Sequence, residues 1–376
     1  MRGLNKNEEA GLLMKLREIQ SKEEFPSLAA IAVQEDEMVW SGNVGYACLD
    51  PKEKASAFTT IYHLGSVTKL FTAVALIKLR DAGNLDLSDT LQKYLPQLTD
   101  LKKQAITLRQ LVTHSSGLPL MPDNEKLNQM MQEFPPTLES LANAKFPTID
   151  EVLAGLDDDV LVGEPGDQVS YSNLGFALLG HVIELVGKRP YATFIKEEIL
   201  RPLKMAGTGF WEQLANTDYQ EFLATCYLPF FDEPTVAPPA MKDAGAFVPA
   251  ASLWASPFAM GQFIKLFTGA SSDLLSKDSI DEMLTLDIST EAARYADSEE
   301  NSGIGLGWFV SELSGHRVVE HGGADPSTAV HLAIIPEQKC GVFVATNSGQ
   351  NPAAVAEASY AILSLLLNTT SQSPRG

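Results

Sequence analysis

A run of ten residues, "LFTAVALIKL" at positions 70–79, constrains the fold more than any other stretch of this chain. Its side chains are apolar all round the helix except at Thr72 and Lys78, and Gly83 is well placed to end it. A helix that is apolar all round is buried, so the rest of the chain must enclose it. Lys69 stands at the head of this run, three residues after Ser66. Burying a lysine is energetically unfavourable, so a lysine in a buried segment indicates a function.

The size and charge of the chain exclude several classes of protein. With 376 residues, it is long enough for one large domain or two closely joined ones. Hydrophobic residues make up 45% and charged residues 20%, which is typical of a globular protein. The net charge of −20 repels nucleic acid and anionic lipid, so we expect neither as a partner. No window approaches 18 uninterrupted apolar residues, so we predict no membrane span.

The amino terminus and the cysteines bear on localisation. Residues 1–20 carry charges throughout and predict an amphipathic helix rather than a signal peptide. The apolar residues of that helix share one face: Leu12, Leu13, Leu16 and Ile19. Cys48, Cys226 and Cys340 are odd in number and widely separated, which favours reduced thiols. We therefore expect a cytoplasmic protein, although a secreted chain trimmed of its signal would look the same.

Strand-like segments occur at both ends of the chain. Residues 28–34 and 37–47 flank Glu35 and Asp36 and predict a hairpin. In the carboxyl third, four short runs rich in β-branched or aromatic residues predict an antiparallel meander, with turns at Ser314–Gly315 and Pro336–Lys339. These four runs are residues 303–312, 317–323, 328–337 and 340–349. Residues 353–367 then predict a closing helix.

The middle of the chain is mostly helical in pattern. Residues 106–119 begin with Thr107 and Gln110 at capping-box spacing and are expected to stop at Gly117 and Pro119. Residues 173–190 carry an apolar stripe that ends at Gly187. Residues 121–150 predict a long loop or irregular cap, and such segments often border binding sites.

These elements together predict an α+β fold of the α/β-sandwich type. An antiparallel sheet is built from both chain ends and flanked by helices, and a mostly helical domain is inserted between them. We place the sheet domain at 1–75 and 250–376, the helical domain at 76–249 and the active site between the two. Residues 368–376 are expected to form a disordered tail.

Ser66 and Lys69 have the residue types and spacing of a nucleophile and its base. A serine hydroxyl needs a base within hydrogen-bond reach, and residues three apart lie on the same face of a helix. Burial disfavours the ammonium form, which lowers the lysine pKa. Amides of the first helical turn can stabilise an oxyanion. The pattern also arises by chance, since a serine before a helix is usually only a cap.

Three segments in order resemble the serine β-lactamase and penicillin-binding-protein family, in particular its class C, D-aminopeptidase and family VIII carboxylesterase branches. "GSVTK" at 65–69 is similar to the first motif of that family, and "YSNLG" at 171–175 to the second. "EHGGADPSTAVHLAIIP" at 320–336 resembles the third, with His321, Gly322 and Gly323 where lactamases carry Lys-Thr-Gly. The resemblance extends from about Phe25 to Ser348.

The resemblance implies an acyl-transfer mechanism without metal or cofactor. Ser66 would attack the substrate carbonyl, and Lys69 would take the proton of the Ser66 hydroxyl. Tyr171 would share the general acid and base catalysis. The amides of Ser66 and Ala324 would form the oxyanion hole, and Asn173 would position the substrate or the lysine. Gly322 and Gly323 would let the substrate approach the strand closely.

The other readings of these residues are structural. Without the family order, Tyr171 and Asn173 would be a loop aromatic and a helix cap, and the glycine pair a bulge. The remaining histidines are interpreted as structural or surface residues: His63, His114, His181, His316 and His331. Neither an HExxH nor a CxxC motif occurs, so we expect no metal site.

The histidine in the third motif decides between the reactions of this family. A lysine there would offer a permanent cation to the carboxylate of a β-lactam, whereas histidine is mostly neutral at pH 7. We therefore expect a carboxylesterase acting on short acyl esters, with a small-molecule ester or amide as substrate. A D-amino-acid or D-Ala-D-Ala peptidase, a β-lactamase, an acyltransferase and a non-catalytic binding or scaffold protein remain alternatives. The oligomeric state is open.

Overall fold

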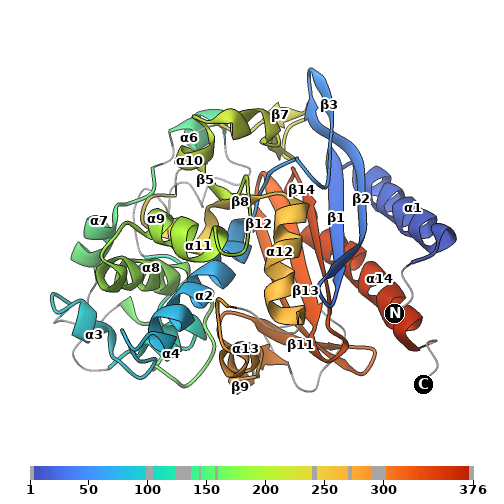
Figure 1. Ribbon diagram of the computed structural model, residues 1–376. Coiled ribbons are helices and arrows are strands. Elements are labelled where there is room, and N and C mark those ends of the chain that lie inside the picture. Colours follow the sequence, from blue (N-terminus) through green and yellow to red (C-terminus); the bar gives the residue numbers. More distant parts are fainter. Residues whose placement is uncertain are drawn as a thin grey trace.

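A computed structural model gives the conformation of most of the chain. It describes residues 4–98, 105–122, 137–143, 145–156, 160–238, 244–269, 273–289 and 302–371. A sheet layered with helices forms one side of the molecule, and the remaining helices gather at the other side (Figure 1). Within the described residues, no helix is long and apolar enough to cross a bilayer.

The central sheet has nine strands among the described residues and draws on both ends of the chain. Its order is β3-β2-β1-β14-β13-β12-β11-β10-β9, and every neighbouring pair is antiparallel. The strands are β1 (Ser27–Gln34), β2 (Glu37–Leu49), β3 (Lys52–Lys54), β9 (Ile288–Ser289), β10 (Gly303–Ile304), β11 (Phe309–Leu313), β12 (His316–Asp325), β13 (Thr328–Ile335) and β14 (Cys340–Thr346). The first and last long strands, β1 and β14, pair directly, which confirms the predicted α+β fold.

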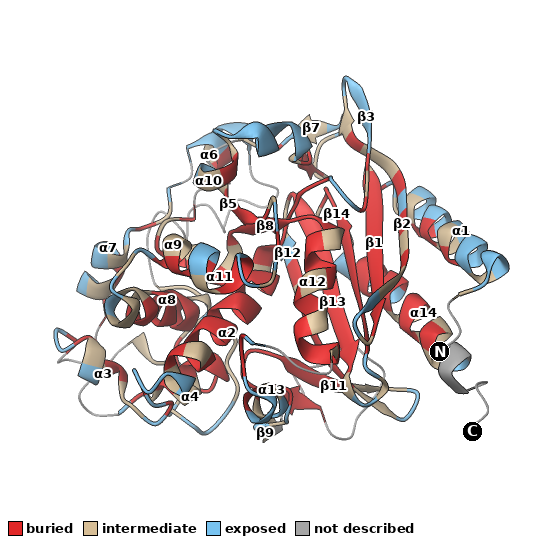
Figure 2. Ribbon diagram, viewed as in Figure 1, coloured by how far each residue is buried: buried red, intermediate tan, exposed pale blue. Residues whose placement is uncertain are grey.

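Helices cover both faces of this sheet. Helices α1 (Lys6–Lys22) and α14 (Pro352–Ser371) pack on one face, where their apolar stripes join Leu28 and Val344 in one core. Helix α12 (Pro257–Thr268) covers β1 and β14 from the other face (Figure 1). The strands between them are buried almost throughout (Figure 2).

The second part of the molecule encloses α2 (Thr68–Asp81), the helix of the apolar run. Eleven of its residues are buried, as the sequence predicts, and α8 (Asn173–Gly187) and α11 (Val248–Ala251) pack against it. The other α-helices among the described residues are α3 (Leu91–Tyr94), α4 (Leu108–Val112), α6 (Leu138–Ala142), α7 (Ile149–Ala154), α9 (Tyr191–Ile195), α10 (Trp211–Leu214) and α13 (Lys277–Met283). Two small sheets complete this part: β4 (Tyr62–His63) with β8 (Leu253–Ala255) and β5 (Gly209–Phe210), and β6 (Tyr227–Leu228) with β7 (Thr235–Val236).

Most predicted elements are confirmed, and two ends are corrected. Helix α4 has the predicted capping box at Thr107 but ends at Val112, well before Gly117, because His114 takes a left-handed backbone conformation and turns the chain. Helix α14 continues through Ser371, past the expected start of the tail at residue 368, while residues 372–376 lie outside the described residues. Much of the predicted cap at 121–150 lies outside them as well. The domain boundaries at 75/76 and 249/250 stay predictions.

Candidate active site

The candidate nucleophile lies in a tight turn between the two parts of the molecule. Ser66 belongs to a 3₁₀ turn, η1 (Gly65–Val67), that leads from β4 into α2. The turn packs against β12 and α11. Gly65 has a φ of +49°, which favours glycine, and it lets the chain reverse here. Ser66 is half-buried, so its hydroxyl remains accessible to a small molecule.

Lys69 is fully buried and has three hydrogen-bond partners. Its Nζ lies 3.2 Å from Ser66 Oγ, 2.7 Å from Asn173 Oδ1 and 3.0 Å from the carbonyl oxygen of Ala250. The amide oxygen and the carbonyl oxygen can only accept, so each takes one N–H of the lysine. The remaining hydrogen-bonding position of Lys69 Nζ faces the Ser66 hydroxyl.

The electrostatics of this site favour a neutral amine. Burial lowers the pKa of Lys69 well below 10.5, and none of its three hydrogen-bond partners is a carboxylate. A neutral amine donates its two N–H groups to Asn173 and Ala250 and keeps a lone pair. That lone pair can accept the hydrogen bond of the Ser66 hydroxyl, which is the geometry required of a general base.

Tyr171 lies beside the lysine on the segment that leads into α8. Its ring centroid is 4.7 Å from Lys69 Nζ, so the lysine sits over the ring face. The imidazole of His114 supports the ring from another side, with 4.3 Å between ring centroids, and accepts a 3.0 Å hydrogen bond from the amide of Ser172 at Nδ1. Burial and the neighbouring Lys69 lower the pKa of His114, so its imidazole is neutral.

His321 closes the site from strand β12 as a neutral imidazole. It is buried, and its Nδ1 donates a 2.6 Å hydrogen bond to the Gly322 carbonyl oxygen. Burial is the largest cause that lowers its pKa from 6.5 to about 3. Its Nε2 has no hydrogen-bond partner among the described residues. The rings of Tyr171 and Phe309 lie 6.3 Å and 5.2 Å from it, centroid to centroid, so the side chains around it are largely apolar.

The glycines of the third motif bring two backbone segments into contact. A Cβ added at Gly323 would lie 2.0 Å from the carbonyl oxygen of Leu64, so only glycine fits there. A Cβ added at Gly65 would lie 3.0 Å from the amide nitrogen of Ala324. The backbone beside Ser66 therefore abuts the amide of Ala324, which places the two expected oxyanion donors on adjoining segments.

A contact between His63 and Asp325 ties these segments together. His63 Nδ1 lies 2.8 Å from Asp325 Oδ2, and its Nε2 lies 2.7 Å from the carbonyl oxygen of Ala251. Burial alone would raise the pKa of Asp325, but His63 and Ser327 hold it low. Asp325 follows the Ala324 amide directly, and Ala251 follows the carbonyl that binds Lys69. The pair therefore connects strand β12, which carries the Ala324 amide, to the segment whose Ala250 carbonyl binds Lys69.

The structure thus brings the predicted residues together around Ser66, and it adds others. His63 and His114 were interpreted as structural, yet both contact segments that carry site residues. The carbonyl of Ala250 escaped sequence reasoning because a backbone acceptor leaves no pattern of residue types. No group of three metal-binding side chains occurs within the described parts of the chain.

Comparison with known proteins places this chain in a family. A human protein named "Putative beta-lactamase-like 1" is 26% identical over 341 residues, which cover 88% of this chain. The chain spans 62% of that relative's length. The octameric penicillin-binding protein homologue from Pyrococcus abyssi is 26% identical, with a TM-score of 0.82 over 96% of this chain and 77% of that one.

A further solved structure and a family model agree with this placement. A D-stereospecific amidohydrolase from Streptomyces sp. is 25% identical, with a TM-score of 0.72 over 93% of this chain and 98% of that one. The model of the family described as "Beta-lactamase" matches residues 14–367. The resemblance carried by the three motifs is therefore confirmed, and this chain belongs to the beta-lactamase family.

Proposed function

We propose that this chain is a serine hydrolase that forms an acyl-enzyme on Ser66 and hydrolyses short acyl esters. One observation carries the proposal: a buried lysine whose pKa is lowered directs its remaining hydrogen-bonding position at Ser66 Oγ, 3.2 Å away. A lysine that only supported the fold would be expected to pair with a carboxylate, and the hydrogen bonds of Lys69 go to an amide, a carbonyl and a hydroxyl.

The acylation step follows from these positions. The Lys69 amine takes the proton of the Ser66 hydroxyl as Oγ attacks the ester carbonyl. The amides of Ser66 and Ala324 donate to the oxyanion of the tetrahedral intermediate. The C–O bond of the ester then breaks, and Tyr171 passes a proton to the leaving alkoxide.

Deacylation uses the same groups in reverse. A water molecule attacks the acyl carbon and gives one proton to the Tyr171 phenolate that acylation left. The bond between the acyl carbon and Ser66 Oγ breaks, Oγ takes back the proton that Lys69 holds, and the carboxylic acid leaves. Asn173 keeps the amine of Lys69 aimed at Ser66 throughout, through its 2.7 Å hydrogen bond.

The neutral state of His321 favours esters over β-lactams. With a pKa of about 3, this imidazole offers no permanent cation to a substrate carboxylate at neutral pH. The ring of Phe309 and the side chain of Met121, which contacts Asn173, make the surroundings apolar. An uncharged acyl ester fits such surroundings better than an anionic substrate does.

Hydrolysis of D-amino-acid amides is the second candidate, because the Streptomyces relative acts with D-stereospecificity as an amidohydrolase. The same nucleophile and base would serve either bond. β-Lactam hydrolysis, and acyl transfer to an alcohol or amine in place of water, are the further alternatives that an assay must separate.

The deciding experiment compares initial rates of the purified full chain on a short-chain aryl ester, a chromogenic cephalosporin and a D-amino-acid anilide. Ser66→Ala is the blank, because it removes the nucleophile and leaves the pocket shape. We expect rapid ester turnover, slow or no reaction with the cephalosporin and none in the blank. A faster reaction with the cephalosporin or the anilide would overturn the ester assignment, and turnover by the blank would overturn the role of Ser66.

A further inference from the structure

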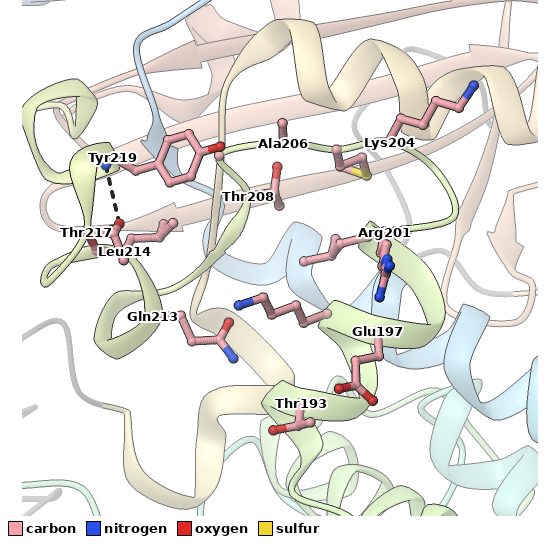
Figure 3. A pocket seen from close by; sticks show the side chains of 14 residues that line it. Thr193, Glu197, Arg201, Lys204, Ala206, Thr208, Gln213, Leu214, Thr217 and Tyr219 are labelled. Atoms are coloured by element: carbon pink, nitrogen blue, oxygen red, sulfur yellow. Dashed lines mark hydrogen bonds between the residues drawn. The ribbon is translucent and has the colours of Figure 1, made fainter.

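A cavity lies in the helical part of the molecule, apart from the catalytic centre. It has a volume of about 650 Å³ and lies between α9, the π-helical turn η4 (Lys196–Leu200) and the segment from Lys204 to Tyr219 (Figure 3). None of the residues that we place at the catalytic centre lines it. Its volume is in the range of small-molecule sites, and π-helical turns are frequent at functional sites.

The cavity is bordered by positive charge in a strongly negative protein. Lys196, Arg201 and Lys204 line it, are exposed and form no ion pair with any residue that the structure describes. Glu197 also lines it, but its carboxylate binds Arg189, 2.7 Å away. In a chain of net charge −20, basic groups left without acidic partners at the mouth of a cavity attract an anion.

The remaining surface of the cavity is partly apolar. Leu200, Met205 and Leu214 are buried side chains that line it. They offer a hydrocarbon chain a surface away from water. An occupant that satisfies the whole lining therefore has an anionic end and an apolar body.

We propose that this cavity binds the carboxylate of a small amphipathic molecule. Arg201 and Lys196 hold the carboxylate at the mouth of the cavity. The planar guanidinium of Arg201 matches a carboxylate with two parallel hydrogen bonds. Leu200 and Met205 contact the hydrocarbon part. The site shares no side chain with the catalytic centre, so this inference does not rest on the proposed ester hydrolysis.

The cavity adjoins the small sheet that leads to the nucleophile. Thr208 directly precedes β5, which pairs with β8, and β8 pairs with β4 at Tyr62 and His63. Ser66 follows three residues after His63. An occupant of the cavity therefore lies beside the same sheet, without entering the catalytic centre.

The test is a calorimetric titration of the full chain with octanoate at low ionic strength, beside its uncharged analogue octanamide. We expect octanoate to bind at least about tenfold more tightly than octanamide, since charge-assisted hydrogen bonds are the stronger class. Arg201→Gln should weaken octanoate binding about tenfold.

Matched variants separate this cavity from other sites. Ala206→Trp, which fills the cavity from its rim, should abolish octanoate binding. Lys188→Gln removes an exposed lysine that does not line the cavity and should leave the affinity unchanged, as should Lys69→Met at the catalytic centre. Circular dichroism checks that each variant is folded.

Four results would overturn the proposal. The first is equal affinity for octanoate and octanamide, and the second is wild-type affinity in Arg201→Gln. The third is the absence of octanoate binding by the wild-type chain at millimolar concentration. Loss of binding in Lys69→Met with retention in Arg201→Gln would place the ligand at the catalytic centre and count equally against it.

Discussion

The two ends of helix α2 hold two cationic residue types in opposite states. At its start, Lys69 is fully buried, has no carboxylate among its hydrogen-bond partners and has a pKa lowered well below 10.5 by burial. Near its end, burial also opposes the charge of Arg80, but hydrogen bonds to Asp81 and Glu282 outweigh it and raise the pKa. The first group can act as a base, and the second stays a cation.

The difference shows that burial alone does not determine whether a basic side chain stays protonated. Arg80 belongs to a network in which Glu282 also binds Arg109, and this network connects α2 to α4 and α13. Its charges satisfy one another, so they serve the fold. Lys69 is left without an opposite charge and is therefore available for proton transfer.

The largest expected effect is at Lys69. Replacing it with methionine, of similar length, should lower kcat/KM on an aryl ester by about 10²–10⁴-fold, because the base that activates Ser66 is removed. The melting temperature should change little, because the loss of a poorly solvated amine offsets the loss of its hydrogen bonds to Asn173 and Ala250. Steady-state kinetics and a thermal melt measure both. Turnover close to wild type would show that Lys69, like Arg80, is not needed for catalysis.

Tyr171→Phe should have the next largest effect. The ring is kept, so its contact with His114 at 4.3 Å and the fold around it should persist. Removing the hydroxyl should lower kcat about 10²-fold if it donates to the leaving group. A leaving group that needs no proton, such as a nitrophenolate, should suffer less than a simple alkoxide. Equal losses for both leaving groups would argue against the acid role.

His321 extends the comparison to a second buried base. Its pKa is about 3 in the folded chain against about 6.5 when unfolded. Between these values the unfolded chain binds the proton and the folded chain does not, so stability falls as pH drops from 6.5 towards 3. His321→Gln should make that fall shallower by about 1 kcal/mol per pH unit between pH 7 and 5, because the unfolded imidazole is only partly protonated near pH 6.5. Denaturant unfolding at pH 7, 6 and 5 measures the slope, and parallel slopes would contradict the assignment.

Arg80→Gln should have the smallest effect, and it should lower stability while leaving turnover unchanged. Removing this partly exposed cation leaves Glu282 with Arg109 alone, and we expect a loss of about 1 kcal/mol in the free energy of unfolding. The kcat at a temperature well below the melting point should stay near that of the wild-type chain. A large loss of kcat with an unchanged melting temperature would show that the two ends of α2 are not separate in role.

The sequence anticipates the elements whose local pattern and tertiary setting agree. The hairpin at 27–49, the meander and the all-round apolar α2 have periodicities that the sheet and the enclosing helices then use. Helix α4 fails this rule: its pattern continues towards Gly117, but the left-handed turn at His114 ends the helix early. That turn brings the imidazole against Tyr171, a contact with no trace in local propensity.

By itself, the sequence determined the three motifs, their order and the buried setting of Lys69, because these depend on residue type and spacing along one chain. Tertiary structure alone decided that Ala250 supplies a carbonyl to that lysine, that His63 pairs with Asp325 and that Gly65 lies against Ala324. Each of these contacts joins segments far apart in sequence, through backbone atoms or single side chains. Their energies depend on distance and burial in three dimensions, which periodicity does not encode.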